Sequence, residues 1–187
     1  MKEKAERDRK SVLASVNNTN LGSTGSNSKT PSIVSNDTWA YVDKLPAGDL
    51  VENVTFRRMA KRDTIEVKLS SGRNKLIRLA GISVFSLVND NYAQKQAKTW
   101  KVPVATILDL GKNNNAYIKG LFTEGEELVV EYFNKRDRDN KAMVFGYVYK
   151  PDGMFVNGTI MKNGQGFLYI SERGMPHIES LQAYQKT

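Results

Sequence analysis

The segment 62–85 constrains the fold of this chain more than any other part of the sequence. Its first half alternates apolar and charged residues, which is the period-2 pattern of a strand with one buried face. The polar residues 70–72 supply a tight turn, and 76–79 returns as a second strand. We therefore predict a β-hairpin with two polar groups placed to meet a ligand, Asp63 at the start of its first strand and Arg78 inside its second.

Further short strands and several helices are expected along the rest of the chain. The segment 104–110 is ambiguous between strand and helix, and 111–115 is expected to be a loop. The expected strands are 39–42, 54–59, 128–133, 142–149 and 167–170, and the expected helices are 92–100, 115–122, 156–162 and 176–185. This order predicts an α+β, mainly β fold: a five-stranded OB-type barrel with an inserted helix and C-terminal helices.

Composition divides the chain into two parts. Residues 1–37 are rich in Ser, Thr and Asn after a short mixed-charge run. Such a segment buries too little apolar area to offset the entropy of ordering it, so we expect a disordered tail. Residues 38–187 are expected to form one domain, which holds no cysteine and therefore no disulfide framework or thiolate metal site.

The charge of the chain favours anionic partners. The formal net charge is +8, and residues 1–38 hold six Lys/Arg and four Asp/Glu, so the remainder carries +6. No apolar run approaches the roughly 20 residues of a membrane-spanning helix, and the N-terminal residues lack the apolar core of a signal peptide. We expect no membrane span. The compartment is unknown, with the cytoplasm or an organellar lumen favoured over secretion.

Several motifs, in order and at about the right separations, resemble the staphylococcal-nuclease (thermonuclease-like) domain. They are R-D-T-I-E-V, L-I-R-L-A-G-I, A-Y-I-K-G-L-F-T-E-G-E-E-L-V-V-E-Y, V-F-G-Y-V-Y-K-P-D-G and V-N-G-T-I-M-K-N-G. The likeness covers 51–184. It implies an ancestry in calcium-assisted phosphodiester hydrolysis, in which two carboxylates hold the cation, a Glu activates water and two Arg stabilise the phosphate.

The resemblance implies that this chemistry has been lost. Asp63 and Arg78 match the first carboxylate and the first Arg of the family, but Ser83, Ser86 and Met143 stand where the second ligand, the catalytic Glu and the second Arg are expected. A hydroxyl is a poor calcium ligand and cannot act as a general base near neutral pH. We therefore expect no catalytic residues, no metal site, no cofactor and no small-molecule substrate.

Two routes would restore residual calcium-dependent nuclease activity, which is the least favoured alternative. Asp90 would enter the site if the 83–92 loop were rebuilt, and Lys141 or Arg138 would replace the lost Arg. Otherwise we predict a non-catalytic module that acts as a structural or interaction subunit of a larger assembly with protein partners.

Nucleic-acid binding is the second prediction. It depends on cations near the first hairpin and in the later 134–140 loop, because such loops flank the ligand face of an OB barrel. The alternative is that these side chains are simply solvated. The candidate residues are Arg57, Arg58, Lys61, Arg62, Arg73, Lys75, Lys135, Arg136, Arg138 and Lys141.

The stretch 89–114 is the candidate surface for a protein partner. It holds more aromatic and aliphatic residues than a solvated loop requires, and exposed apolar area on an insertion is typical of a contact surface. The alternative is that the stretch packs across the open side of the barrel. The residues expected to contact a partner are Tyr92, Trp100, Ile107 and Leu110.

Overall fold

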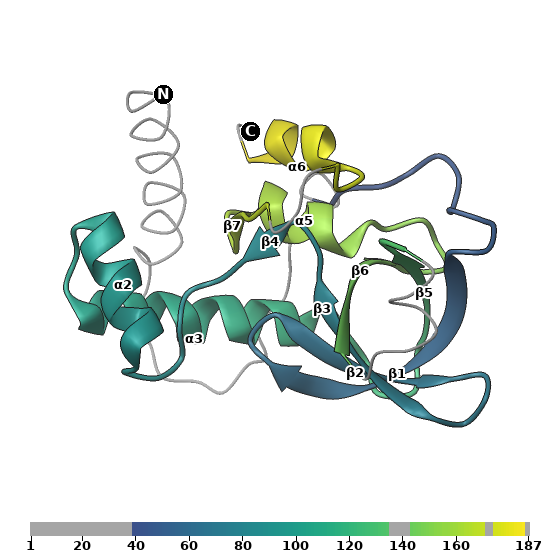
Figure 1. Cartoon of the computed structure of the whole chain (residues 1–187), viewed down its shortest axis with the longest axis horizontal. Helices are drawn as coiled ribbons and strands as arrows, with labels where there is room; N and C mark the ends of the chain where they lie inside the picture. The colour runs from purple at the N-terminus through teal and green to yellow at the C-terminus, as the bar shows by residue number, and fades with distance from the viewer. Residues whose placement is uncertain (1–38, 135–142, 171–173, 186–187) are drawn as a thin grey trace, which may run out of the picture.

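A closed five-stranded barrel forms the centre of the computed structural model, which describes residues 39–134, 143–170 and 174–185 (Figure 1). The strand order around the barrel is β1-β2-β3-β6-β5. The strands are β1 (Val51–Lys61), β2 (Thr64–Leu69), β3 (Asn74–Leu79), β5 (Glu127–Tyr132) and β6 (Met143–Tyr149). The predicted α+β, OB-type barrel is therefore confirmed. The predicted tail, 1–37, lies outside the described residues.

The hairpin predicted from the sequence is β2 and β3. The two strands pair antiparallel from Thr64 with Arg78 to Lys68 with Asn74, and the apolar residues of β2 at 65, 67 and 69 are buried. β3 then pairs parallel with β6, and β5 pairs antiparallel with both β6 and β1. Because one face of each strand is buried in the barrel, a slip of one residue would turn the apolar side chains outward, which fixes the register.

β1 is longer than predicted and irregular. Its pairing with β2 shifts register twice, between Phe56 and Arg58 and again between Met59 and Lys61. Each shift places one extra residue on β1, as in a β-bulge. A bulge bends the strand and changes the direction of its side chains. β5 pairs with only the first part of β1, 51–55, whereas β2 continues to Lys61.

Helices surround the barrel on two sides (Figure 1). α2 (Asn91–Trp100) and α3 (Val104–Gly120) lie to the left of the barrel in this view, and α5 (Val156–Lys162) and α6 (Ile178–Tyr184) lie above it. A small sheet of β4 (Ile82–Ser83) and β7 (Phe167–Leu168) joins the two groups. The segment at 39–42, predicted to be a strand, forms only an isolated bridge between Tyr41 and Met154.

The predicted loop at 111–115 is wrong, because α3 continues through it without a break. Its buried positions Ile107, Leu110, Asn114 and Ile118 recur at helical spacing, and the helix is fixed by what they contact. Asn114 donates its amide to Gln165 at 3.0 Å, which satisfies a buried polar group that would otherwise oppose the helix. Tertiary contacts therefore override the low helix propensity of the three consecutive Asn residues.

A second, smaller core forms between α2, α3 and the loop that follows β4. Phe85, Ile107 and Leu110 are buried in it, and the half-buried ring of Trp100 packs edge-on against Phe85 with 5.4 Å between ring centroids. The expectation that Ile107 and Leu110 expose apolar surface to a partner is therefore wrong. The helices cover the apolar surface beside the barrel instead, and contact of Tyr92 or Trp100 with a partner stays a prediction.

Candidate functional site

Asp63, the expected first carboxylate, lies buried just before β2 and is already paired. It is 3 % exposed, and its Oδ2 accepts a hydrogen bond of 3.0 Å from Nε of Arg78, while Oδ1 accepts one of 3.2 Å from the Thr64 hydroxyl. β2 and β3 bring Asp63 and Arg78 together because Thr64 and Arg78 are directly opposed in the ladder. Both oxygens of the carboxylate therefore have donors within the protein.

Ser83 and Ser86, where the resemblance implies lost acids, are also bonded within the fold. The Oγ of Ser83, which is 1 % exposed, lies 2.8 Å from the hydroxyl of Tyr92 on α2. Ser86 is fully buried, and its hydroxyl donates to the carbonyl of Val88 at 3.1 Å. Gln96 of α2 binds the backbone of the same segment. Its side chain accepts a hydrogen bond from the N–H of Ser86 at 2.9 Å and donates one to the carbonyl of Val84 at 3.0 Å.

Asp90, the acid that would restore a second ligand, is used to begin α2. It is the N-cap residue, and its carboxylate accepts a hydrogen bond of 2.8 Å from the backbone N–H of Ala93. That bond is the main reason why the pKa of Asp90 lies below its usual value, although slight desolvation opposes it. The carboxylate also lies 3.4 Å from the Ser86 hydroxyl, so it is held at the helix end.

Arg78 faces two aromatic rings. Its guanidinium carbon lies 5.3 Å from the ring centroid of Phe145 and 5.7 Å from that of Tyr169. Met143, where the resemblance implies a lost Arg, is 48 % exposed and cannot supply charge. Within the described residues, no cluster of three or more His, Asp or Glu is arranged to hold a metal ion.

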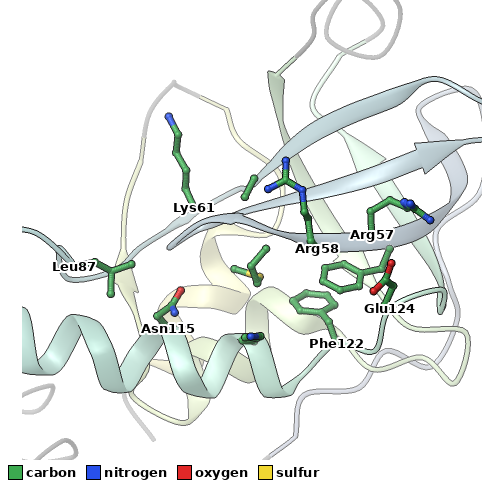
Figure 2. A pocket seen from close by; sticks show the side chains of 11 residues that line it. Arg57, Arg58, Lys61, Leu87, Asn115, Phe122 and Glu124 are labelled. Atoms are coloured by element: carbon green, nitrogen blue, oxygen red, sulfur yellow. The ribbon is translucent and has the colours of Figure 1, made fainter.

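Three of the predicted nucleic-acid-binding residues line one open cavity of about 530 Å³ between β1 and α3, although the side chains of Arg58 and Lys61 extend from β1 away from α3 (Figure 2). Arg57, Arg58 and Lys61 extend from β1, and Asn115 comes from α3. The bulge in β1 between Phe56 and Arg58 explains why the two consecutive Arg side chains are both exposed. The complete lining is Phe56, Arg57, Arg58, Met59, Ala60, Lys61, Leu87, Asn115, Lys119, Phe122 and Glu124.

The other members of the predicted basic set do not join this cavity. Lys75 is only 6 % exposed and its ammonium lies 4.9 Å from the ring centroid of Tyr132, so the expectation of a solvent-facing cation there is wrong. Arg62 lies over the ring of Tyr92 at 4.4 Å. Arg73 is exposed beyond the turn of the β2–β3 hairpin. The remaining predicted residues, Lys135, Arg136, Arg138 and Lys141, lie outside the described residues.

Sequence reasoning missed the α3 side of the cavity. Lys119 adds a fourth cation opposite β1, and Leu87 adds apolar surface. Lys119 could not be found from sequence because its position depends on where α3 crosses β1. The aromatic rings of Phe56 and Phe122 are stacked on each other with 4.8 Å between centroids, and both are buried.

A further charged group lies where the segment before α6 meets the barrel. Nε2 of His177 lies 2.8 Å from Oε2 of Glu131, which also accepts a hydrogen bond of 2.9 Å from the Tyr149 hydroxyl. Burial by itself raises the pKa of Glu131, but the hydrogen bond and charge of His177 and the bond from Tyr149 outweigh it and hold this pKa below its usual value. Burial and the nearby Glu131 raise the pKa of Tyr149.

Comparisons with known proteins add no assignment to this geometry. No protein-family model matches the chain, and a search of curated proteins finds no match either. Among the described residues, none of the helices has both the length and the apolar character needed to cross a membrane. The resemblance to the staphylococcal-nuclease domain therefore stays a prediction from the sequence motifs.

Proposed function

We propose that this chain is a non-catalytic binding module that acts as an interaction subunit of a larger assembly. The observation that carries this proposal is the arrangement at Asp63, Arg78, Ser83 and Ser86, in which each side chain is bonded to a neighbour within the fold. A working phosphodiesterase of the resembled type needs carboxylates open to a cation and a base open to water. Here the only carboxylate of the group is buried and paired with Arg78.

The magnitude of the expected loss supports the same proposal. Removing one charge-stabilising group from an active site commonly lowers kcat by about 10²–10³-fold. The motif resemblance implies that this chain lacks a ligand, the general base and one cation together, at Ser83, Ser86 and Met143. Asp90 is held at the start of α2 by the hydrogen bond from Ala93, so it does not substitute for the missing acids without unwinding the helix end.

A plasmid-nicking assay with and without calcium tests this proposal. We expect supercoiled plasmid to stay intact with the wild-type chain in both conditions. The matched control is Asp63→Ala, which removes the one carboxylate of the group. Calcium-dependent nicking by the wild type that is lost in Asp63→Ala would show a working nuclease, whereas nicking that is equal in both would come from a contaminant.

Nucleic-acid binding without cleavage is a second candidate, favoured by four cations that line one cavity, Arg57, Arg58, Lys61 and Lys119. Cations that contact phosphates release counterions, so such binding would weaken steeply as salt rises. A gel-shift titration with single-stranded DNA across a range of salt concentrations tests it. A shift that survives unchanged at high salt, or no shift at low salt, would contradict this candidate.

A further inference from the structure

The cavity between β1 and α3 has an open strand edge as one of its walls. β5 pairs with β1 only over 51–55, and the last backbone bonds on that side join Phe56 to Gly125 and Glu126. Beyond Phe56, no strand among the described residues pairs with the edge of β1 that faces away from β2. All five residues of this half, 57–61, line the cavity. An unpaired edge is a template for adding another strand.

The charge of the side chains that line the cavity indicates what kind of partner strand could pair with this edge of β1. Three cations come from β1 and one from α3, against one lining acid, Glu124, and Arg58 is also paired with Glu66 on β2 at 2.6 Å. Arg57, Arg58, Lys61 and Lys119 are all exposed. Met59 and Leu87 are half-buried and provide apolar surface between the cations. A ligand that alternates acidic and apolar side chains would match both features, because successive side chains of a strand point to opposite faces.

The described aromatic residues of the cavity do not favour a nucleic-acid strand. Single-stranded nucleic acid is held by cations along its backbone and by bases stacked on exposed aromatic rings. The two rings here, Phe56 and Phe122, are 5 % and 9 % exposed and stack on each other instead. No other aromatic residue lines the cavity within the described part of the chain. A peptide needs no ring, because its backbone pairs with the strand edge.

The other segments of this chain do not supply a matching strand. Residues 1–38 hold six basic and four acidic residues and are net positive, and 135–142 hold four basic and two acidic residues and are also net positive. Neither complements four cations. The occupant that fits is therefore an acidic segment of another protein.

We propose that an extended, acidic peptide of a partner protein binds this groove by adding as a strand to β1 at 57–61. This inference rests on the proposed function as a binding module and names the partner class and the surface. The backbone of β1 would supply hydrogen bonds, Arg57, Lys61 and Lys119 would contact acidic side chains, and Met59 and Leu87 would contact apolar ones. Arg58 is already paired with Glu66 at 2.6 Å.

Fluorescence anisotropy with the full chain tests the proposal. The probe is a fluorescein-labelled peptide of alternating glutamate and leucine, and the comparison probes are the glutamine–leucine peptide, the glutamate–leucine peptide N-methylated at alternate residues, and labelled oligothymidine. We expect the acidic peptide to bind and the first two comparison peptides to bind at least about tenfold more weakly, a difference of about 1.4 kcal/mol. N-methylation removes backbone donors and leaves the side chains, so it reports strand addition directly.

Charge-reversal variants locate the binding site. Arg57→Glu combined with Lys119→Glu should weaken binding of the acidic peptide at least about tenfold, which again corresponds to about 1.4 kcal/mol. The matched control reverses two exposed cations away from the cavity, Lys68→Glu with Arg73→Glu, and should bind as the wild type does. Circular dichroism checks that both variants are folded.

Each other outcome overturns the proposal. Equal binding of the N-methylated peptide would exclude strand addition, and equal binding of the glutamine–leucine peptide would exclude the role of charge. Oligothymidine binding that is lost in the groove variant, without peptide binding, would assign the surface to nucleic acid. No binding by any probe would also reject the groove as a peptide site. None of these results bears on plasmid nicking, so the failure of this inference and the failure of the proposed function are distinguishable.

Discussion

At the scale of single residues, the pairing of Asp63 with Arg78 decides what the corner beside β2 can do. The carboxylate is buried and the guanidinium side chain is 27 % exposed, so the pair is screened by solvent on one side only. Taking a charge out of water is costly unless an opposite charge and hydrogen bonds compensate. Arg78 and Thr64 provide that compensation, which gives Asp63 a structural role in the present fold.

Removing Arg78 should destabilise the domain. In Arg78→Met the carboxylate of Asp63 would remain buried without its counter-charge, and we expect a loss of roughly 1–3 kcal/mol in the free energy of unfolding, less than for a fully buried pair. Urea denaturation measures it. The matched control is Arg58→Met, because Arg58 pairs with Glu66 at 2.6 Å but its side chain is 68 % exposed. That change should cost less than about 1 kcal/mol. Equal losses in the two variants would contradict this account.

Glu131 should make stability depend on acid pH. Its pKa in the folded state lies below its usual value, so the folded form binds its proton less readily than the unfolded chain. The stability that Glu131 contributes is therefore fully present above the unfolded pKa and is lost as pH falls through the folded pKa. Glu131→Gln should unfold with a weaker acid dependence than the wild type, measured by thermal unfolding from neutral pH downward. An unchanged acid dependence would show that the His177 contact does not influence this carboxylate.

At the scale of elements, α3 is held against the segment after β4 by a close backbone approach. A Cβ placed on Gly111 would lie 2.1 Å from the carbonyl oxygen of Ser86 and 3.1 Å from that of Phe85. Only a glycine allows α3 to approach so closely. The sequence pattern suggested a loop at this glycine, whereas the physical reason for it is helix packing.

Substituting Gly111 should therefore separate α3 from this segment. We expect Gly111→Ala to destabilise the domain by about 1–3 kcal/mol, as overpacking typically does. The matched control is Gly120→Ala at the end of the same helix, where a Cβ would meet nothing within 4 Å. That change should be neutral or stabilising by up to about 1 kcal/mol, since alanine favours helix. Urea denaturation compares them. A tolerated Gly111→Ala would contradict the close approach of α3.

The elements that could be predicted from the sequence are those whose pattern is local. The alternation in β2 and the turn at 70–72 identified the hairpin, and the pairing of Thr64 with Arg78 follows from its register. The bulges of β1 and the course of α3 depend on contacts far apart in the chain. For that reason the sequence identified Arg57, Arg58 and Lys61 as cations but could not place Lys119 opposite them.

At the scale of the whole molecule, the site at Asp63 and the cavity between β1 and α3 differ in how open they are. The side chains of Asp63 and Ser83 are bonded within the fold, whereas the cavity between β1 and α3 is open and lined by cations. The basic residues predicted near the first hairpin divide between these places and the far end of the hairpin, where Arg73 lies. Overall positive charge favoured an anionic partner, and the structure adds that four of the described cations line one cavity beside β1.

We infer that the bonding of Asp63, Ser83 and Ser86 within the fold leaves no group free for phosphodiester cleavage. Incubation of supercoiled plasmid with the full chain in calcium, beside the same reaction in a chelator, tests it most directly. We expect the plasmid to stay supercoiled in both reactions. Nicked plasmid that accumulates with calcium, disappears with chelator and is abolished by Asp63→Ala would contradict it.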